Sequence, residues 1–319
     1  DNIGGARFVY MPTINLTGTG YTTGLDGDIT YKGPVYSRYG NPEVTWEVGK
    51  KVNVGLDLQL FNSLNLTMDY FHETRTDIFQ ERGTIPQYLG TAGTKVFGNL
   101  AAMKNQGLDF AADFNKKIGK DWFISFKGTF TYAHNEITKY DESPKYAFQS
   151  KVGQSANSPS IMISDGLFKD PDDVKNSNQQ IGGNLSAGDI KYVNISKLYG
   201  YDDDIVDISD WVWAKNPTVP EIVYGFGPSM KWKNWDFSFF FQGVARTSFM
   251  MYGMHLFGTT SIKNMLQFVA DDHWSVDNPN PNAAYPRLTK DSNGNNDQYS
   301  TYWLRNAAFL KLKNAEIGY

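Results

Sequence analysis

The chain has 319 residues, of which 40% are hydrophobic and 15% aromatic, and its formal net charge at pH 7 is -4. This slightly acidic balance gives no indication of nucleic-acid binding, and the lack of any run of about 18 apolar residues excludes a helical membrane protein. The cysteine count is 0, which removes disulfides, thiolate nucleophiles and cysteine metal sites. The first residues lack the basic and apolar regions of a signal peptide, so we expect a mature or internal segment.

The first clear strand pair lies between Val52 and Phe71. Apolar and polar residues alternate from Val52 to Leu60, and the alternation resumes at Leu64 after a turn near Asn62. Because successive side chains of a strand point to opposite faces, each strand has one apolar and one polar face. The pattern therefore predicts two antiparallel strands joined by a short turn.

Two further pairs follow the same pattern. One covers residues 108–132 with a turn at 116–120, and the other covers residues 224–241 with a turn at Lys233 and Asn234. Strands of soluble proteins average about 5–6 residues, whereas a tilted strand that crosses a bilayer needs about 9–11, and these segments are long. Aromatic residues bracket the turns, as expected of the aromatic girdle at a membrane interface.

The remaining connections are long, at residues 73–105, 135–220 and 244–302. A compact soluble domain rarely contains such connections, whereas short periplasmic turns and long extracellular loops are typical of outer-membrane barrels. The sequence therefore predicts an all-β fold, an antiparallel transmembrane β-barrel of which this chain is a part. The strands of residues 1–319 alone are too few to form a closed barrel.

Alternation also assigns side chains to the two faces of the barrel wall. The residues expected to face lipid are Val54, Leu56, Leu58, Phe126, Phe237 and Phe239. Those expected to face the lumen are Asn53, Asp57, Gln59, Lys127 and Gln242.

Two other classes compete with this interpretation. A soluble all-β glycan-binding or glycan-cleaving module accounts for the aromatic residues, but not for long strands with short turns at one end only. An outer-membrane barrel enzyme needs a catalytic group. The four histidines have neither metal-ligand spacing nor a neighbouring nucleophile motif, so we do not expect an enzyme. Dependence on detergent would separate the barrel from the soluble module.

Several motifs occur in the order and spacing of a known family. The stretch from Asn41 to Glu47, NPEVTWE, runs into Val54-Gly55-Leu56-Asp57 and resembles a conserved stretch of the SusC/RagA group of TonB-dependent outer-membrane transporters. Further matches in the same order are Asp69–Phe71 with Thr76–Phe79, Gly98-Asn99 with Lys104–Asp109, Asp165–Phe168, Gly188–Tyr192, Pro220 to Phe226, Trp274 with Asn278-Pro279, Tyr285–Arg287, Leu310–Asn314, and Gly318-Tyr319. Each match is short, but together they cover nearly the whole chain from residue 40 onward.

The resemblance implies that residues 1–319 are the C-terminal part of a TonB-dependent receptor β-barrel, with the plug domain and the final strands absent. It implies energy-coupled import of a large nutrient, a glycan or an oligopeptide, across the cell outer membrane. The implied partners are a SusD-like lipoprotein lid, TonB acting through the missing N-terminal part, outer-membrane lipid and the substrate.

The loop between residues 188 and 210 is the first candidate site. Family members often carry an EF-hand-like acidic run here, and carboxylates so spaced could surround a calcium ion. In this chain the run is degraded, because Asn194 replaces the first carboxylate and Asp204 replaces the turn glycine. The oxygen ligands that remain are Asp202, Asp203, Asp207 and Asp210. The alternative is a solvated acidic loop. Calcium is the one cofactor that the sequence suggests, and it indicates no other.

Four aromatic residues in the same region form the second candidate site: Tyr199, Tyr201, Trp211 and Trp213. Flat amphipathic rings suit stacking on sugars or gripping of a peptide. The same rings could instead pack against the lid or within the loop, and the sequence leaves these alternatives open.

Overall fold

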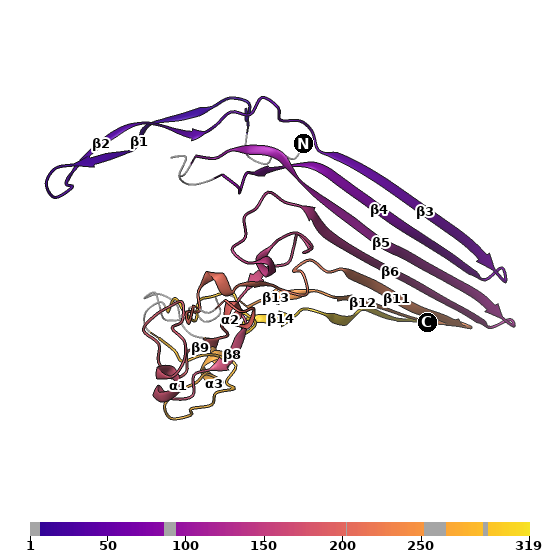
Figure 1. Cartoon of the computed structure of the whole chain (residues 1–319). Coiled ribbons are helices and arrows are strands. Elements are labelled where there is room, and N and C mark those ends of the chain that lie inside the picture. The colour runs from indigo at the N-terminus through magenta and orange to yellow at the C-terminus, as the bar shows by residue number, and fades with distance from the viewer. Residues whose placement is uncertain (1–6, 86–93, 202, 252–265, 290–292) are drawn as a thin grey trace.

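Seven long strands form the main sheet of the computed structural model, which describes residues 7–85, 94–201, 203–251, 266–289 and 293–319 (Figure 1). They are β3 (Val48–Leu60), β4 (Leu64–Glu81), β5 (Phe97–Ile118), β6 (Trp122–Lys139), β11 (Ile222–Trp232), β12 (Trp235–Ala245) and β15 (Phe309–Gly318). Their order in the sheet is β15-β12-β11-β6-β5-β4-β3 and every pairing is antiparallel. The sheet is therefore an up-and-down meander that follows the chain.

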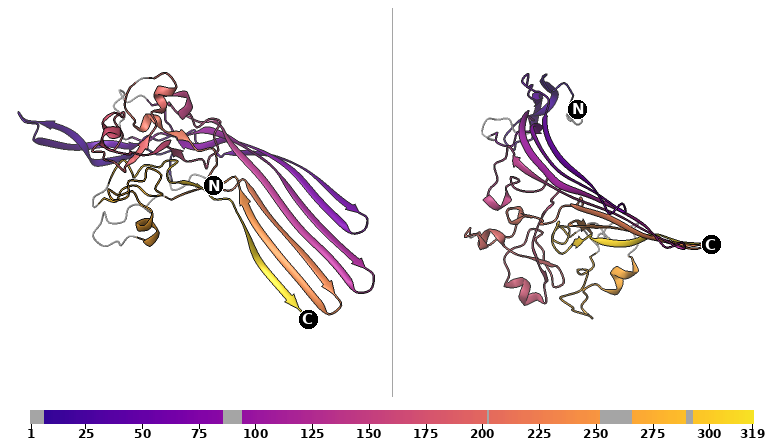
Figure 2. Two further views of the ribbon diagram at one scale, coloured as in Figure 1. Left: turned by 90° about the horizontal axis from the view of Figure 1, so that it is seen from below. Right: turned by 90° about the vertical axis from the view of Figure 1, so that its right-hand side faces the viewer.

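Short turns join the strands at one end of this sheet, and long loops join them at the other (Figures 1 and 2). Phe61 and Asn62, in the three-residue connection between β3 and β4, have φ of 53° and 49°. This is the left-handed conformation of the two central residues of a type I′ turn, and the Ser63 N–H donates to the Leu60 carbonyl at 3.1 Å across it. Gly119 and Lys233 provide the positive φ at the other two turns. The predicted asymmetry between short turns and long loops is confirmed.

The strands run further toward the loop end than the sequence predicted. The first connection was expected to begin at residue 73, yet β4 continues to Glu81 and β5 already begins at Phe97. The pairing of β4 with β5 shifts between Arg75 and Ile78, and Asp77 there has a φ of 56°. Such a bulge reverses the alternation of side chains. The alternation in the sequence therefore did not predict that these strands continue beyond the bulge. The prediction of a turn at 116–120 was also too wide, because β5 runs through residue 118.

The pairing register confirms that the two predicted sets of side chains lie on opposite faces. Leu58 pairs with Leu66, which pairs in turn with Ala112, whereas Asp57 pairs with Thr67. Following the ladder across all seven strands places the six expected lipid-facing residues together and the five expected luminal residues together.

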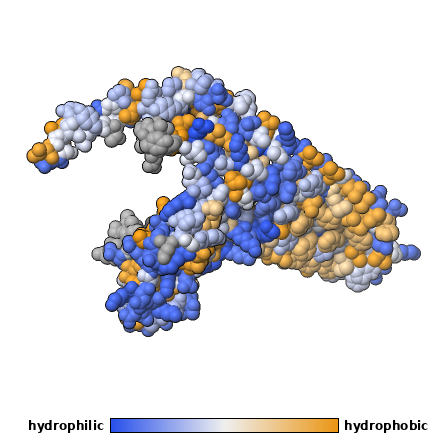
Figure 3. Space-filling view, in the orientation of Figure 1, coloured by the Kyte–Doolittle hydropathy of each residue, from blue (hydrophilic) through white to orange (hydrophobic). Residues whose placement is uncertain are grey.

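The apolar face of the sheet is open. Val54 is 64% exposed and Leu56 is 49% exposed, and the apolar surface is continuous over the turn end of the strands (Figure 3). Stacked indoles of Trp122 and Trp232, 5.6 Å apart, mark the edge of this surface beside the turns. A soluble module would bury such a face in its core, because contiguous apolar patches of this extent are rare on monomeric soluble proteins.

Both edges of the sheet are also open within the described part of the chain. There β3 pairs only with β4, and β15 pairs only with β12. The sheet does not close on itself in these residues, as the strand count predicted. An unpaired strand edge in a bilayer leaves backbone groups unsatisfied.

The long loops build a second layer at the loop end of the sheet, which we call the loop module (described residues of 140–221 and 246–308). Its short elements are η2 (Ala147–Gln149), β7 (Ser160–Ile161), β8 (Ser164–Leu167), α1 (Pro171–Lys175), β9 (Ile190–Tyr192), α2 (Ile195–Leu198), η3 (Ile208–Asp210), β10 (Val212–Trp213), β13 (Ser248–Met250), α3 (Gln267–Asp271) and β14 (Leu304–Asn306). Trp303, Met162, Ile190 and Val206 are fully buried in a shared hydrophobic core. The two long loops therefore fold together rather than separately.

A separate hairpin, β1 (Thr13–Thr23) and β2 (Ile29–Arg38), projects beyond the loop end (Figure 1). It is attached where the backbone N–H of Tyr39 donates to the carbonyl of Lys95 at 3.0 Å. No helix within the described residues is long and apolar enough to cross a membrane.

The open apolar face generates the first prediction. In the membrane-embedded protein, Leu58→Arg should destabilise the fold, by up to about 2–4 kcal/mol, because a cation on the lipid-facing side of the sheet loses its hydration. Asp57→Asn, one residue away on the polar face, should change stability little, since an asparagine oxygen still accepts the 2.7 Å hydrogen bond from Thr67. Urea unfolding in lipid vesicles measures both variants, and equal effects would contradict the assignment of faces.

Candidate functional site

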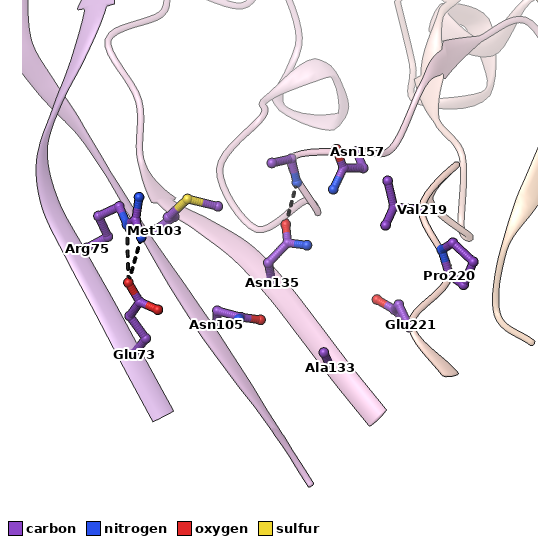
Figure 4. A pocket seen from close by; sticks show the side chains of 11 residues that line it. Glu73, Arg75, Met103, Asn105, Ala133, Asn135, Asn157, Val219, Pro220 and Glu221 are labelled. Atoms are coloured by element: carbon purple, nitrogen blue, oxygen red, sulfur yellow. Dashed lines mark hydrogen bonds and ion pairs between the residues drawn. The ribbon is translucent and has the colours of Figure 1, made fainter. Parts of the chain in front are cut away.

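A cavity of about 320 Å³ lies where the polar face of the sheet meets the loop module (Figure 4). Strands β4, β5 and β6 form its wall, and the loop segments 156–157 and 219–221 close it from the other side. The lining residues are Glu73, Arg75, Met103, Asn105, Ala133, Asn135, Ala156, Asn157, Val219, Pro220 and Glu221.

Strand register explains why polar side chains meet here. Lys51 pairs with Glu73, Glu73 with Asn105, and Asn105 with Asn135, so these four residues form one row across four strands. Residues that pair directly in a sheet point to the same face, which in this case is the polar face. The row therefore presents charged and amide groups side by side at one height of the wall.

The charged groups of the cavity are all paired. The guanidinium of Arg75 donates to Glu73 Oε1 at 2.8 Å and to Glu47 Oε1 at 2.9 Å. The carboxylate of Glu221, whose side chain is only 4% exposed, accepts from Arg246 at 2.6 Å and lies 2.5 Å from the His134 ring nitrogen. Each full charge in the wall is thus compensated by a neighbour of opposite sign.

The amide groups, in contrast, remain partly available. The Oδ1 atom of Asn135 accepts from the backbone N–H of Ala156 at 2.8 Å and from the Ser155 hydroxyl at 3.1 Å, which positions the loop over the cavity. Within the described residues, the side chain of Asn105 has no hydrogen-bond partner, and neither do the Asn135 Nδ2 group and the Asn157 side chain. The cavity can therefore donate hydrogen bonds to a ligand and accept them from it.

Sequence reasoning missed this cavity. It placed Glu73, Arg75, Asn105 and Asn135 in long connections, although the first two belong to β4 and the others to β5 and β6. The signal that could have found them is the alternation of polar residues at positions 65, 67 and 69, which Phe71 interrupts and which resumes at Glu73 and Arg75 beyond the predicted end of the strand.

The structure brings two of the predicted aromatic residues into one cluster. Tyr201 lies 4.3 Å from Tyr146 and Tyr199 lies 4.8 Å from Phe148, while Tyr146 and Phe148 stack on each other at 5.4 Å, all between ring centroids. Tyr199 and Tyr201 are still 63% and 48% exposed. Packing within the loop is therefore shown, and contact of their outer faces with a ligand or lid stays a prediction.

The two predicted tryptophans are more enclosed. Trp211 packs against the core of the loop module. Trp213 donates its indole N–H to the carbonyl of Gln149 at 2.9 Å. Both side chains contribute to the folding of the loop, and their contact with a ligand stays a prediction.

The predicted calcium ligands serve as hydrogen-bond acceptors within their own loop. Asp210 is fully buried and accepts from the backbone N–H groups of Ser196 at 2.8 Å and Asp207 at 2.9 Å. Asp207 accepts from the Ser209 N–H at 2.6 Å, and Asp203 accepts from the Ile205 N–H at 3.3 Å. Asp202 lies outside the described residues. Among those that are described, no group of three or more acidic, histidine or cysteine side chains could hold a metal ion, so calcium binding stays a prediction.

A buried ion pair ties the two halves of the loop module together. Asp189 is fully buried, and Arg287 donates to its two carboxylate oxygens at 2.8 and 3.0 Å. The side-chain amides of Asn293 and Asn296 each donate to the same carboxylate at 2.9 Å. A paired and fully hydrogen-bonded carboxylate is the form in which a buried charge is tolerated. Two of the motifs noted in the sequence, Gly188–Tyr192 and Tyr285–Arg287, meet at this pair.

Gly188 has a second role at this junction. Its φ is +84°, and a Cβ atom there would lie 2.3 Å from the indole of Trp274. The ring of Trp274 thus occupies space that only glycine leaves open. The backbone N–H of Arg287 donates to the Gly188 carbonyl at 2.9 Å, which fixes the approach of the two segments.

The antiparallel meander, with one apolar exposed face and a cavity on its polar face, has the form of a wall segment of a large membrane barrel. Residues 4–308 match the family described as TonB dependent receptor-like, beta-barrel, and the chain belongs to that family. The SusC/RagA resemblance seen in the sequence is confirmed by the relatives that follow.

TonB-dependent receptor P3 of Formosa agariphila is 23% identical over 301 residues, which cover 92% of this chain and 29% of the relative. TonB-dependent receptor SusC of Bacteroides thetaiotaomicron is 25% identical over 340 residues, covering 99% of this chain and 30% of SusC. The RagAB peptide transporter superposes with a TM-score of 0.62 at 21% identity, over 97% of this chain and 32% of that chain, and shares its fold. This chain therefore spans about a third of the length of the proteins it matches.

The ion pair between Asp189 and Arg287 generates the second prediction. Arg287→Met should destabilise the loop module by about 3 kcal/mol, because it leaves a buried carboxylate without its counter-charge. Lys197→Met is the matched control in the same module, since the side chains of Lys197 and its partner Asp204 are 48% and 71% exposed and such surface pairs contribute little. Limited proteolysis of the loops detects the difference, and equal protection of both variants would contradict it.

Proposed function

We propose that this chain is the C-terminal part of the barrel of a SusC/RagA-type transporter, which imports a large nutrient across the outer membrane. The observation that carries the proposal is the seven-stranded meander, with an open apolar face outside and a polar, cavity-bearing face inside. The apolar face suits contact with lipid, and the polar face suits a water-filled passage.

The number of strands supports the proposal that this chain is one part of a larger barrel. A transporter barrel of about 22 strands has a lumen wide enough to hold a plug, and seven strands are roughly a third of that number. The matched proteins are likewise about three times as long as this chain. The unpaired edges of β3 and β15 would then join the remaining strands, and the plug would connect the barrel to TonB.

The relatives indicate the chemical class of the nutrient but not which compound it is. RagAB is a peptide transporter, and the SusC/RagA resemblance extends to glycan import. A SusD-like lipoprotein would seat on the loop module, which lies at the end of the sheet opposite the short turns. We expect this contact to exceed about 2,000 Å² over the whole protein, as large permanent interfaces do.

The exposed faces of Tyr199 and Tyr201 are the surface we assign to that lid or to the nutrient. Leu198 and Ile208, which are 71% and 66% exposed, lie in the same loop. Deleting residues 196–213 would remove the buried Val206 and Asp210 as well, and so would disrupt the loop module itself. Point variants of the two tyrosines therefore test the surface more cleanly.

The third prediction follows. A strain that lacks the whole gene should lose growth on one class of glycan or peptide, and the double variant Tyr199→Ser, Tyr201→Ser should reduce that growth while the protein reaches the cell surface in normal amounts. Tyr21→Ser, an exposed tyrosine of the β1–β2 hairpin (69% exposed), is the control and should grow normally. Unchanged growth of the gene-deletion strain on every nutrient would contradict the proposed function. If only the double variant grows normally, the two tyrosines do not belong to the surface that binds the lid or the nutrient, and the import function still stands.

A further inference from the structure

The side chains that line the cavity in Figure 4 favour one of the two nutrient classes, glycans over peptides. We propose that it is a subsite for one neutral sugar residue of a larger glycan, held by the carboxamides of Asn105, Asn135 and Asn157. This inference rests on the proposed import function and selects between its two substrate classes, glycans and oligopeptides.

The charged groups of the cavity wall are already paired with one another or with their neighbours. The two carboxylates in the cavity wall, Glu73 and Glu221, and the single guanidinium, Arg75, are already engaged in ion pairs of 2.6 to 2.9 Å. A peptide terminus or a charged side chain would have to break one of these pairs or stay uncompensated beside them, and a charge that is partly desolvated without a counter-charge is disfavoured. The cavity thus favours a neutral ligand.

The polar groups of the cavity that remain available for a ligand are carboxamides. A carboxamide both donates and accepts hydrogen bonds, and so does a sugar hydroxyl. Asn105 and Asn135 are direct partners in the register of β5 and β6, so their amides sit side by side. Asn157 approaches from the loop on the opposite side. Three amides around one space match the several hydroxyls that surround a sugar ring.

The rest of the lining is apolar: Met103, Ala133, Ala156, Val219 and Pro220. A sugar ring has an apolar face of C–H groups between its hydroxyls, and a surface of small apolar side chains can cover that face. The volume of about 320 Å³ is at the lower end of the roughly 300–1,000 Å³ that small-ligand pockets span. The cavity therefore accommodates a single ring rather than a whole oligomer.

The experiment uses the full-length protein in its own strain. Growth on a panel of neutral glycans and on peptide mixtures first identifies the nutrient that the gene-deletion strain cannot use. The variant Asn105→Ala is then compared with Asn65→Ala, an amide on the same face of the same sheet near the turn end, in uptake of that nutrient at limiting concentration.

We expect the nutrient to be a neutral glycan and Asn105→Ala to raise the half-saturating concentration by about five- to tenfold, the loss expected for one hydrogen-bonding side chain. Asn65→Ala should behave as the unmodified protein. A requirement for peptide, or a glycan whose uptake is equal in Asn105→Ala and Asn65→Ala, would overturn the sugar subsite and leave the import function standing. Normal growth of the deletion strain on every nutrient would instead overturn the import function.

Discussion

Every backbone N–H and C=O group that enters a bilayer must be paired within the protein, and the rest of this structure follows from that constraint. It is met here by antiparallel strands that pair in chain order, with one side chain outward and the next inward. Because the period is two, a single ladder register decides the apolar and polar faces of the six strands from β3 to β12 over their turn-end halves, and the pairing with β15 contains a register shift between Phe240 and Phe241. The paired Leu58 and Leu66 and the paired Asp57 and Thr67 show the two outcomes, one rung apart.

Regular alternation gives every strand a similar pair of faces and so provides little basis for selecting a ligand. We therefore expect ligand selectivity to arise at the loop end of the strands. At the loop end the alternation is broken by bulges, and the two long loops fold over the polar face. The buried pair of Asp189 and Arg287 and the close contact of Trp274 with Gly188 join the two halves of the loop module. Residues 156–157 and 219–221 of the same module line the amide cavity opposite the strands, and Asn135 accepts there from the Ala156 N–H at 2.8 Å.

Much of the fold could be predicted from the sequence, because alternation is a local signal that survives wherever one face is apolar. The strand pairs, the short turns and both faces followed from it, and the order of short motifs indicated the family. The loop ends of β4 and β5 could not be predicted, since the bulge near Asp77 reverses the alternation. The cavity was lost with them. Contacts such as Asp189 with Arg287, 98 positions apart, have no local signal, although the motifs that contain them were visible.

For the candidate sites, too, the sequence indicated which residues to consider, but only the structure shows what they contact. The aromatic residues Tyr199 and Tyr201 were found from composition, and the structure groups them, but only a three-dimensional arrangement reveals that Tyr146 and Phe148 complete their cluster. The acidic run was found from its likeness to a calcium loop. Its carboxylates, however, hydrogen-bond to backbone groups of the same loop, a use that spacing alone does not distinguish from metal binding.

The measurement that tests the account most directly is the environment of successive residues along β3. Single cysteines placed at residues 53 to 59 in an otherwise cysteine-free protein, spin-labelled in lipid vesicles, report collisions with oxygen from the lipid and with a nickel chelate from water. We expect collision rates that alternate with a period of two residues, with oxygen favoured at 54, 56 and 58 and the nickel chelate favoured at 53, 55, 57 and 59. Water access at all seven positions, or the opposite phase, would contradict it.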